Sequence, residues 1–291
     1  MRSHHLLLLA TIAFAPGTAL AVPTYTITDI GDLGGTFSLG FDVNNAGQVT
    51  GAGLIQNDVG QYAFLWDPVS GIQDLGTLGG RFSQGIGINA RGQITGNSLL
   101  PGPEITGRVH AFLWEPTTGM RDLGTRSGEF SIGNDINDRG QITGTNQTSD
   151  ADFRAFLWDS ANGIQDLGTL GGRYSSGNGI NNNGQVVGSS EDANRSEHAF
   201  LWDGTSMFDL NGLISPEAGW TVIRGEAISD NGQITGIGIN PNSQLHAFLL
   251  TPVTIAEIPE PGTLALIAAG CVGLGLVRHR RRRYDDGTIR R

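Results

Sequence analysis

The sequence contains no lysine, and all 18 of its basic residues are arginine. A chain without lysine forms no lysine Schiff base with a substrate and supplies no P-loop lysine to a nucleotide. The one cysteine, Cys271, excludes an intramolecular disulfide and a zinc site built from cysteines. Positive charge is also scarce, because the formal net charge is −10. An acidic chain is a poor partner for nucleic acid, and we expect none.

Glycine, in contrast, is abundant, with 45 of 291 residues, about twice its usual share of ~7%. Glycine and proline together stay below the ~25–30% that is typical of disordered chains. The length allows one large domain or two small ones. The composition therefore predicts a folded chain that is rich in turns.

The N-terminus reads as an export signal. One arginine, Arg2, precedes a short apolar run, and Ala19 and Ala21 form a small-x-small cleavage site for signal peptidase. We therefore expect residues 1–21 to be a signal peptide and Val22 to be the first residue of the mature protein. An uncleaved N-terminal anchor is the alternative.

The C-terminal region, residues 255–291, has three parts in a fixed order. A proline-rich peptide is followed by an apolar run that predicts a short transmembrane helix over residues 262–277, and then by arginines that mark its cytoplasmic end. The residues that carry this pattern are Pro259, Glu260, Pro261, Arg278, Arg280, Arg281, Arg282 and Arg283.

This three-part tail resembles the PEP-CTERM sorting signal. The resemblance implies a protein of the Gram-negative envelope that crosses the inner membrane and is held there briefly by its C-terminal helix. An exosortase then processes it, and it ends at the cell surface or outside the cell. The resemblance also implies a cell that makes exopolysaccharide or biofilm. A plain C-terminal anchor is the alternative.

The middle of the chain, residues 22–254, is one unit repeated five times. Gly-Gln-(Ile/Val)-(Thr/Val)-Gly occurs at residues 47–51, 92–96, 140–144, 184–188 and 232–236. Ala-Phe-Leu-Trp occurs at 63–66, 111–114, 155–158 and 199–202, and returns as Ala-Phe-Leu-Leu at 247–250. Asp-Leu-Gly occurs at 32–34, 74–76, 122–124 and 166–168, and weakens to Asp-Leu-Asn at 209–211. Repeats at this spacing indicate an array of supersecondary units.

Each unit contains four short strand-like pieces separated by turns such as Asn89-Ala90-Arg91-Gly92 and Pro116-Thr117-Thr118-Gly119, which predicts an all-β fold of four-stranded sheets. Four strands in about 45 residues match one blade of a β-propeller. The fifth unit lacks its fourth strand, and residues 25–33 look like that strand at the other end of the chain. We therefore predict a five-bladed propeller-like ring that is closed by the N-terminal strand. A β-helix or an open array is the rival.

Three units carry His-Ala-Phe, at His110, His198 and His246, and the array resembles the HAF-repeat extracellular proteins. The resemblance implies secretion and a propeller-like fold, and it implies no chemistry. Because these histidines occupy one repeat position, we interpret them as framework, with a metal held around the ring axis as the alternative. The repeated tryptophans Trp66, Trp114, Trp158 and Trp202 favour packing between units over stacking on sugars.

A catalytic centre needs residues that break the repeat. Glu226 does so on an expected innermost strand, and with Asp42 and Asp135 it would line a central funnel. Glycoside hydrolysis needs two carboxylates roughly 5–9 Å apart. The turns after Asp42 and Asp135 lack the distal glutamate of a calcium loop. We expect no cofactor and no metal.

Two functions follow from these features. The first is a noncatalytic exported protein of the cell surface or matrix, with a structural or interaction role that involves exopolysaccharide. The alternative is a polysaccharide-active hydrolase or lyase that uses Asp42, Asp135 and Glu226.

Overall fold

The structure is a computed structural model, and it describes residues 26–102 and 107–253. The expected signal peptide, the transmembrane helix and the sorting residues lie outside the described residues. Within the described ranges, no helix is long and apolar enough to cross a membrane.

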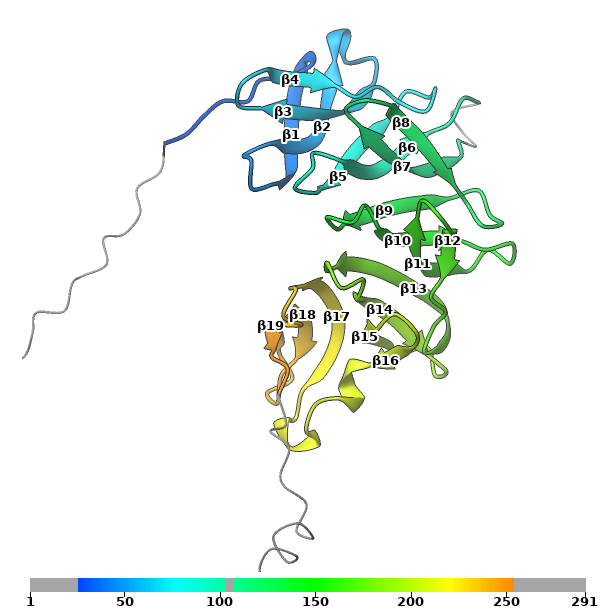
Figure 1. The fold of residues 1–291 in the computed structure, drawn as a ribbon. Helices are drawn as coiled ribbons and strands as arrows, with labels where there is room; N and C mark the ends of the chain where they lie inside the picture. The colour runs from blue at the N-terminus through cyan, green and yellow to red at the C-terminus, as the bar shows by residue number, and fades with distance from the viewer. Residues whose placement is uncertain (1–25, 103–106, 254–291) are drawn as a thin grey trace, which may run out of the picture.

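The five repeats form five antiparallel units, which we number one to five (Figure 1). A parallel bridge between Phe153 and Tyr174 joins units three and four into one eight-stranded sheet. Unit one contains β1 (Gly34–Val43), β2 (Val49–Ile55), β3 (Gln61–Asp67) and β4 (Gly71–Asp74). Unit two contains β5 (Ser83–Ile88), β6 (Ile94–Leu99), β7 (Val109–Glu115) and β8 (Gly119–Gly124). Unit three contains β9 (Ser131–Ile136), β10 (Ile142–Gln147), β11 (Phe153–Asp159) and β12 (Gly163–Asp166).

Unit four contains β13 (Gly171–Ile180), β14 (Val186–Asp192), β15 (Glu197–Trp202) and β16 (Met207–Asp209). Unit five has three strands, β17 (Thr221–Ile228), β18 (Ile234–Ile239) and β19 (Leu245–Leu250). Short 3₁₀ turns lie at Gln56–Asp58, Leu210–Gly212 and Pro216–Ala218. The prediction of an all-β fold is confirmed, and the described strands all lie between residues 34 and 250.

Two of the repeated motifs meet inside each unit. The second strand begins within Gly-Gln-Ile-Thr-Gly, and the third strand carries Ala-Phe-Leu-Trp. In unit three, Gly144 pairs with Phe156, and a Cβ at Gly144 would lie 3.0 Å from the Phe156 ring and would collide with the Ile132 carbonyl oxygen. Glycine is therefore required there because the first strand and the phenylalanine ring both approach the backbone closely.

The hydrophobic core is divided among the four junctions between successive units. At the junction of units one and two, Ala63 and Leu65 of β3 pack with Ile88, Phe112 and Trp114 of the next unit. Equivalent clusters fill the other three junctions. Each unit is therefore stabilised by its neighbours, as in other repeat proteins. Residues 22–254 contain all the described strands and all four clusters.

The predicted closure of the ring is wrong for this structure. Among the described residues, β19 pairs only with β18, and residues 26–32 form no strand. Ile27 is 100% exposed. The five sheets follow an open arc, with a gap between units one and five (Figure 1). The packed side chains of four junctions set how far the chain turns, and that turn does not bring the first and last sheets together.

The N-terminal segment nevertheless contains the turn that follows the fourth strand in the other units. This turn lies at residues 29–31, three residues before the predicted Asp-Leu-Gly at 32–34. The Gly31 N–H donates to Asp29 Oδ1 at 2.9 Å, as the Gly76 N–H donates to Asp74 Oδ1 at 2.7 Å. Ser38 Oγ donates to the Gly31 carbonyl at 2.7 Å. Asp32 makes the same bond to the Gly34 N–H at 2.6 Å, but Gly31 is the glycine seven residues before the junction serine, as Gly76 is before Ser83, so the counterpart of Asp74 is Asp29.

Candidate functional site

A pocket of about 360 Å³ lies where the first strands of all five units end, and we call it the central mouth. Each unit contributes the last residue of its first strand and the start of the following turn. The aliphatic members are Val43, Ile88, Ile136, Ile180 and Ile228, and the polar members are Asn44, Asn45, Asn89, Asn137, Asp138, Asn181, Asn182, Ser229 and Asp230. The mouth is thus a shallow, mainly polar site that belongs to the whole array.

A ladder of asparagines holds the wall of the mouth together. Asn89 Nδ2 donates to the Asn137 carbonyl of the next unit at 3.0 Å, and Asn137 Nδ2 donates to the Asn181 carbonyl at 3.0 Å. Asn44 and Asn181 make the same bond to Asn89 and Ser229. Each asparagine oxygen also accepts N–H groups of its own turn, so the repeat position needs an amide, which both donates and accepts.

The rim of the mouth carries Asp138, Asn182 and Asp230 from units three, four and five. Asn182 Nδ2 lies 3.2 Å from Asp138 Oδ2 and 3.0 Å from Asp230 Oδ2. The backbone N–H and then the side chain of Asn182 lower the pKa of Asp230. The rim therefore presents the two carboxyl groups to solvent, and carboxylate oxygens accept hydrogen bonds from hydroxyls.

The three predicted carboxylates do not line the mouth. Asp42 accepts from the N–H groups of Val43 and Ile88, both at 2.8 Å. Asp135 accepts from its own unit at Ile136, 2.7 Å, and from the next unit at Ile180, 2.9 Å. In each carboxylate, one oxygen accepts an N–H of its own strand and the other accepts an N–H of the next unit, which is a structural role that periodicity alone did not reveal.

Glu226 lies apart from this arrangement. Its Oε1 is 3.6 Å from Nη1 of Arg224, and about two-fifths of its side chain is exposed. At the same repeat position, Asn134 and Asn178 donate to the backbone carbonyls of Gly177 and Gly225 in the following units. Glu226 belongs to the last unit, which has no following unit with a carbonyl at this place, and its partner is an arginine on its own strand.

Asp135 is surrounded by inner strands although its edge reaches solvent. Burial raises its pKa from 3.8 to about 6, and the negative charge of Asp42 adds to the rise. The N–H groups of Ile180 and Ile136 oppose it. The structure thus brings Asp42 and Asp135 within electrostatic reach of each other, and it leaves Glu226 with Arg224.

We expect the free energy of unfolding to fall as pH rises from 4.5 to 7.5. The native protein binds the Asp135 proton more tightly than the unfolded chain, so ionisation costs stability, up to about 3 kcal/mol for this shift. Urea titrations of residues 22–254 at several pH values measure this slope. We expect Asp135→Asn to remove most of this dependence of stability on pH. Asp150→Asn, at an exposed loop position, is the control and leaves the dependence unchanged. Equal slopes in wild type and Asp135→Asn would contradict the assignment.

The histidines and tryptophans have framework positions. His110 Nδ1 lies 2.9 Å from Asp122, and His198 Nδ1 lies 2.7 Å from Asp209, each within one unit. Trp114, Trp158 and Trp202 are buried in the junction clusters. Within residues 26–102 and 107–253, no cluster of histidine, cysteine, aspartate and glutamate is arranged to hold a metal ion.

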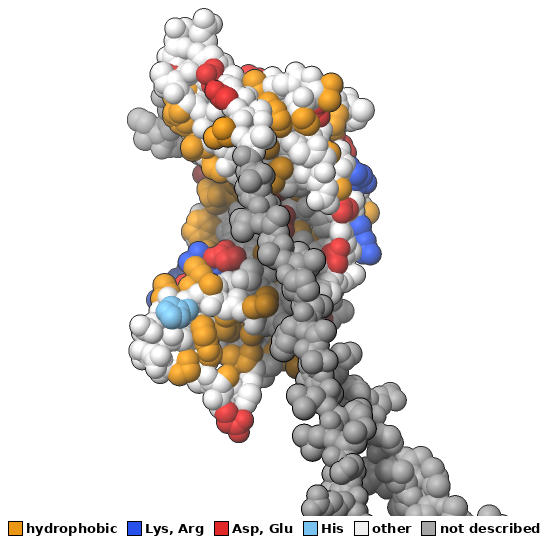
Figure 2. Space-filling view, turned by 90° about the vertical axis from the view of Figure 1, so that its left-hand side faces the viewer, with side chains coloured by type: hydrophobic (Ala, Val, Ile, Leu, Met, Phe, Trp, Pro, Cys, Tyr) orange, Lys and Arg blue, Asp and Glu red, His pale blue; other side chains and the backbone are white. Residues whose placement is uncertain are grey.

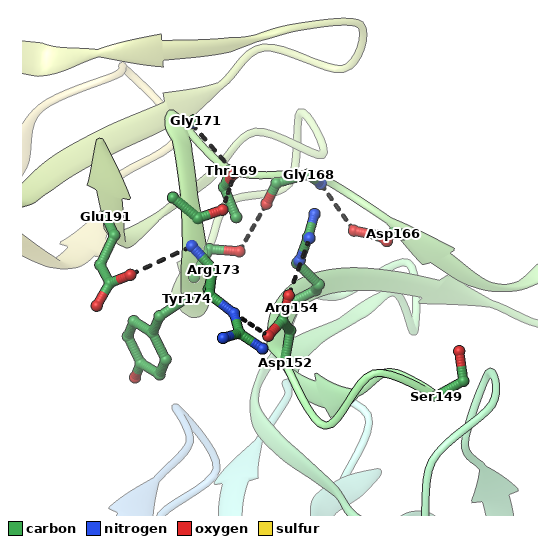
Figure 3. Close-up of polar contacts among 12 residues, drawn as sticks. Ser149, Asp152, Arg154, Asp166, Gly168, Thr169, Gly171, Arg173, Tyr174 and Glu191 are labelled. Carbon is green, nitrogen blue, oxygen red and sulfur yellow. Dashed lines mark hydrogen bonds and ion pairs between the residues drawn. The ribbon is translucent and has the colours of Figure 1, made fainter. Parts of the chain in front are cut away.

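A charged cluster breaks the repeat between units three and four, where Arg154 replaces the histidine (Figure 3). Arg173 Nε lies 2.7 Å from Asp152 Oδ1, and Arg154 Nη2 lies 3.6 Å from Asp152 Oδ2. The Arg173 N–H also donates to Glu191 at 3.2 Å. In the sequence, Arg154 is visible only as an arginine at the position that histidine occupies in three other units, because its partner Asp152 lies outside the repeated motifs. The cluster is an ion-pair network that ties two sheets together.

The fold and the mouth define the chain as an array of β-sheet units with a quasi-symmetric polar centre. The PEP-CTERM protein-sorting motif matches residues 257–282 and makes the chain an exosortase-sorted protein of the Gram-negative envelope. The family described as "Protein of unknown function (DUF3466)" matches residues 81–245. The chain belongs to this family.

Known proteins add little beyond these matches. No curated protein matches the chain. A gluconolactonase from Xanthomonas campestris is similar at 12% identity and a TM-score of 0.42, covering 75% of this chain and 77% of that one. TolB from Acinetobacter baumannii is similar at 11% identity and a TM-score of 0.43, and the match covers 73% of this chain and 54% of TolB. A mutant of AofleA from Arthrobotrys oligospora is similar at 13% identity and a TM-score of 0.36, and the match covers 75% of this chain and 70% of that protein. These scores are too low to support an inference.

Proposed function

We propose that the protein is a noncatalytic component of the cell surface or extracellular matrix whose central mouth binds hydroxyl-rich chains such as exopolysaccharide. The observation that carries this proposal is the composition of the mouth, where five units present asparagine, aspartate and serine around one shallow pocket. Such groups bind neutral hydroxyls by donating and accepting hydrogen bonds. The export signal brings the mouth to the compartment where such polymers occur.

The test is to incubate purified residues 22–254 with the exopolysaccharide of the producing cell. We expect binding without new reducing ends or unsaturated products. Asn182→Ala removes the amide that holds Asp138 and Asp230, and we expect it to weaken binding. Asn162→Ala, which changes an exposed turn between β11 and β12 that does not line the mouth, is the matched control. Equal binding by all three proteins, or no binding, contradicts the proposal.

A hydrolase or lyase is the second candidate, and one observation favours it. A carboxyl with a pKa of about 6, such as Asp135, donates a proton near neutral pH, and Asp42 is close enough to influence it. Product formation that Asp135→Asn abolishes supports this candidate. Product formation that survives in this variant excludes Asp135 as the acid.

Sorting is tested separately from binding. Replacing Pro259, Glu260 and Pro261 by alanine removes the motif that the exosortase recognises, so we expect the variant to keep its arginine-rich tail and to stay in the membrane fraction. Mass spectrometry of the wild-type protein from the surface fraction reports a chain without residues 278–291. The same change at Thr251, Pro252 and Val253, before the matched region, is the control. An intact tail in the released wild-type protein would rule out processing.

A further inference from the structure

The first three junctions use one repeated set of contacts. The alanine N–H of a third strand donates to a serine on the first strand of the next unit: Ala63 to Ser83 at 2.8 Å, Ala111 to Ser131 at 2.9 Å, and Ala155 to Ser175 at 2.8 Å. The serine Oγ donates in turn to a glycine carbonyl seven residues earlier, at 2.6–2.7 Å. A junction therefore has a donor half on one unit and an acceptor half on the next.

The outer face of β18 and β19, which we call the C-terminal face, is a donor half without an acceptor. Thr235 Oγ1 donates to the Phe248 carbonyl at 2.9 Å, as Thr50 Oγ1 donates to the Phe64 carbonyl in unit one. Leu249 is 64% exposed, whereas its internal counterpart Leu65 is 6% exposed. Ala247 is also exposed. Figure 2, which looks onto the open side, shows hydrophobic side chains around the hollow between the two ends of the arc.

The N-terminal end, formed by residues 26–31 and β1, is an acceptor half without a donor. Ser38 already makes the bond to Gly31 that the internal serines make to their glycines. A Cβ at Gly40 would meet only Val49 of its own sheet, whereas its counterpart Gly85 lies against Thr50 of the preceding unit. Val43 is 62% exposed, and its counterpart Ile88 is 6% exposed. Nothing in the described part of the chain covers this end.

The two ends also match in strand register. In unit one, Phe64 pairs with Asp74 and Trp66 pairs with Ile72. The same register would pair β19 with residues 26–29, placing Phe248 opposite Asp29 and Leu250 opposite Ile27. It would also give His246 the aspartate that its counterpart His110 has in Asp122. The missing fourth strand of unit five therefore has a fitting sequence at the N-terminal end.

We propose that the C-terminal face of one copy binds the N-terminal end of a second copy, so that molecules join head to tail through the junction that also joins units within the chain. Closing one molecule on itself requires the gap to shut, which would repack four filled junctions, and packed cores resist such change. A second copy reaches the face with every internal junction unaltered. The added strand gives main-chain hydrogen bonds to an otherwise open edge. Such an association is heterologous and extends along an axis or closes as a ring of copies.

The test uses residues 22–254, which contain the whole described fold and no native cysteine. Ile27→Cys is mixed with Leu250→Cys, so that a disulfide can form only between molecules. Because the Phe64 and Asp74 register leaves Ile27 and Leu250 as a directly opposed pair, mild oxidation is expected to give a cross-linked dimer. Ile27→Cys mixed with Val69→Cys is the control, since Val69 is 95% exposed and lies in a turn away from the C-terminal face.

The double variant Ile27→Cys with Leu250→Cys separates the two possible occupants. A ladder of cross-linked multimers supports the proposal, and a fast-migrating, internally bridged monomer overturns it. Cross-linking no greater than in the Val69→Cys control also overturns it. Light scattering of the protein without added cysteines is expected to show a mass that rises with concentration. Leu249→Arg lowers the association constant by about tenfold or more, ~1.4 kcal/mol, while Val69→Arg does not.

Discussion

Gly144→Ala is expected to lower the free energy of unfolding by about 3 kcal/mol or more, the upper range for overpacking a filled site. The added methyl would collide with the carbonyl oxygen of Ile132 on the neighbouring strand and would lie 3.0 Å from the Phe156 ring. Neither group yields easily, because Ile132 belongs to the first strand of unit three and Phe156 is fully buried. The midpoint of urea unfolding of residues 22–254 measures the effect.

The matched control is Gly212→Ala. Gly212 lies at the end of a 3₁₀ turn, and an added Cβ there would meet no atom within 4 Å. We expect its stability to stay within about 0.5 kcal/mol of wild type. If both variants unfold at the same urea concentration, the close strand approach at Gly144 is not what selects glycine.

Phe112→Ala is expected to lower the free energy of unfolding by about 3–5 kcal/mol, as large-to-small substitutions of buried aromatic residues do. Phe112 is fully buried in the cluster between units one and two, where it packs with Leu65 and Ile88. Removing its ring leaves a cavity in a junction, so the change affects two units and not one. Thermal and urea unfolding both report the loss, and hydrogen exchange locates it in β3 and β5–β7.

Phe208→Ala is the control for the loss of a phenylalanine. Phe208 lies on β16 and is 40% exposed, so its removal leaves no closed cavity and is expected to cost about 1 kcal/mol or less. A loss for Phe112→Ala as small as this would mean that the junctions are not the core of the molecule.

The sequence predicts the units well because each unit repeats its own turn chemistry. Asn89 and Gly92 begin and end a turn whose bonds are the same in the other units, and Gly92 has the positive φ of 72° that the turn requires. The alternation of apolar residues then defines the strands on either side. The burial of the tryptophans also follows from their fixed place in the repeat.

Closure and chemistry were harder to predict, for a physical reason in each case. Whether five units close depends on small angles at the junctions, and no motif encodes an angle directly. Asp42 and Asp135 look like candidate catalytic groups in the sequence because they are expected on inner strands, where they would line a central funnel with Glu226. In the structure, backbone N–H groups of the next unit bind them, and only the fold brings those groups close.

The Asp-Leu-Gly register shows a third kind of error. Asp32 matches the motif by letters and accepts the N–H of Gly34, as Asp29 accepts the N–H of Gly31, so the hydrogen bond alone does not separate them. Only Gly31 lies seven residues before Ser38 and accepts its hydroxyl. Counting from the serine that joins two units would have found the right aspartate. Spacing to a contact residue is thus a better guide than similarity of three letters.

The division of the core among junctions also bears on how such a gene can change in length. Excising or inserting one whole repeat removes or adds one junction and leaves the others with their contacts, so the change in stability is that of a single interface. The segment to remove or insert runs from one Gly-Gln motif to the residue before the next Gly-Gln motif. The reach of the arc and the number of asparagines around its centre would then vary in whole steps, while the sorting motif at residues 257–282 stays untouched.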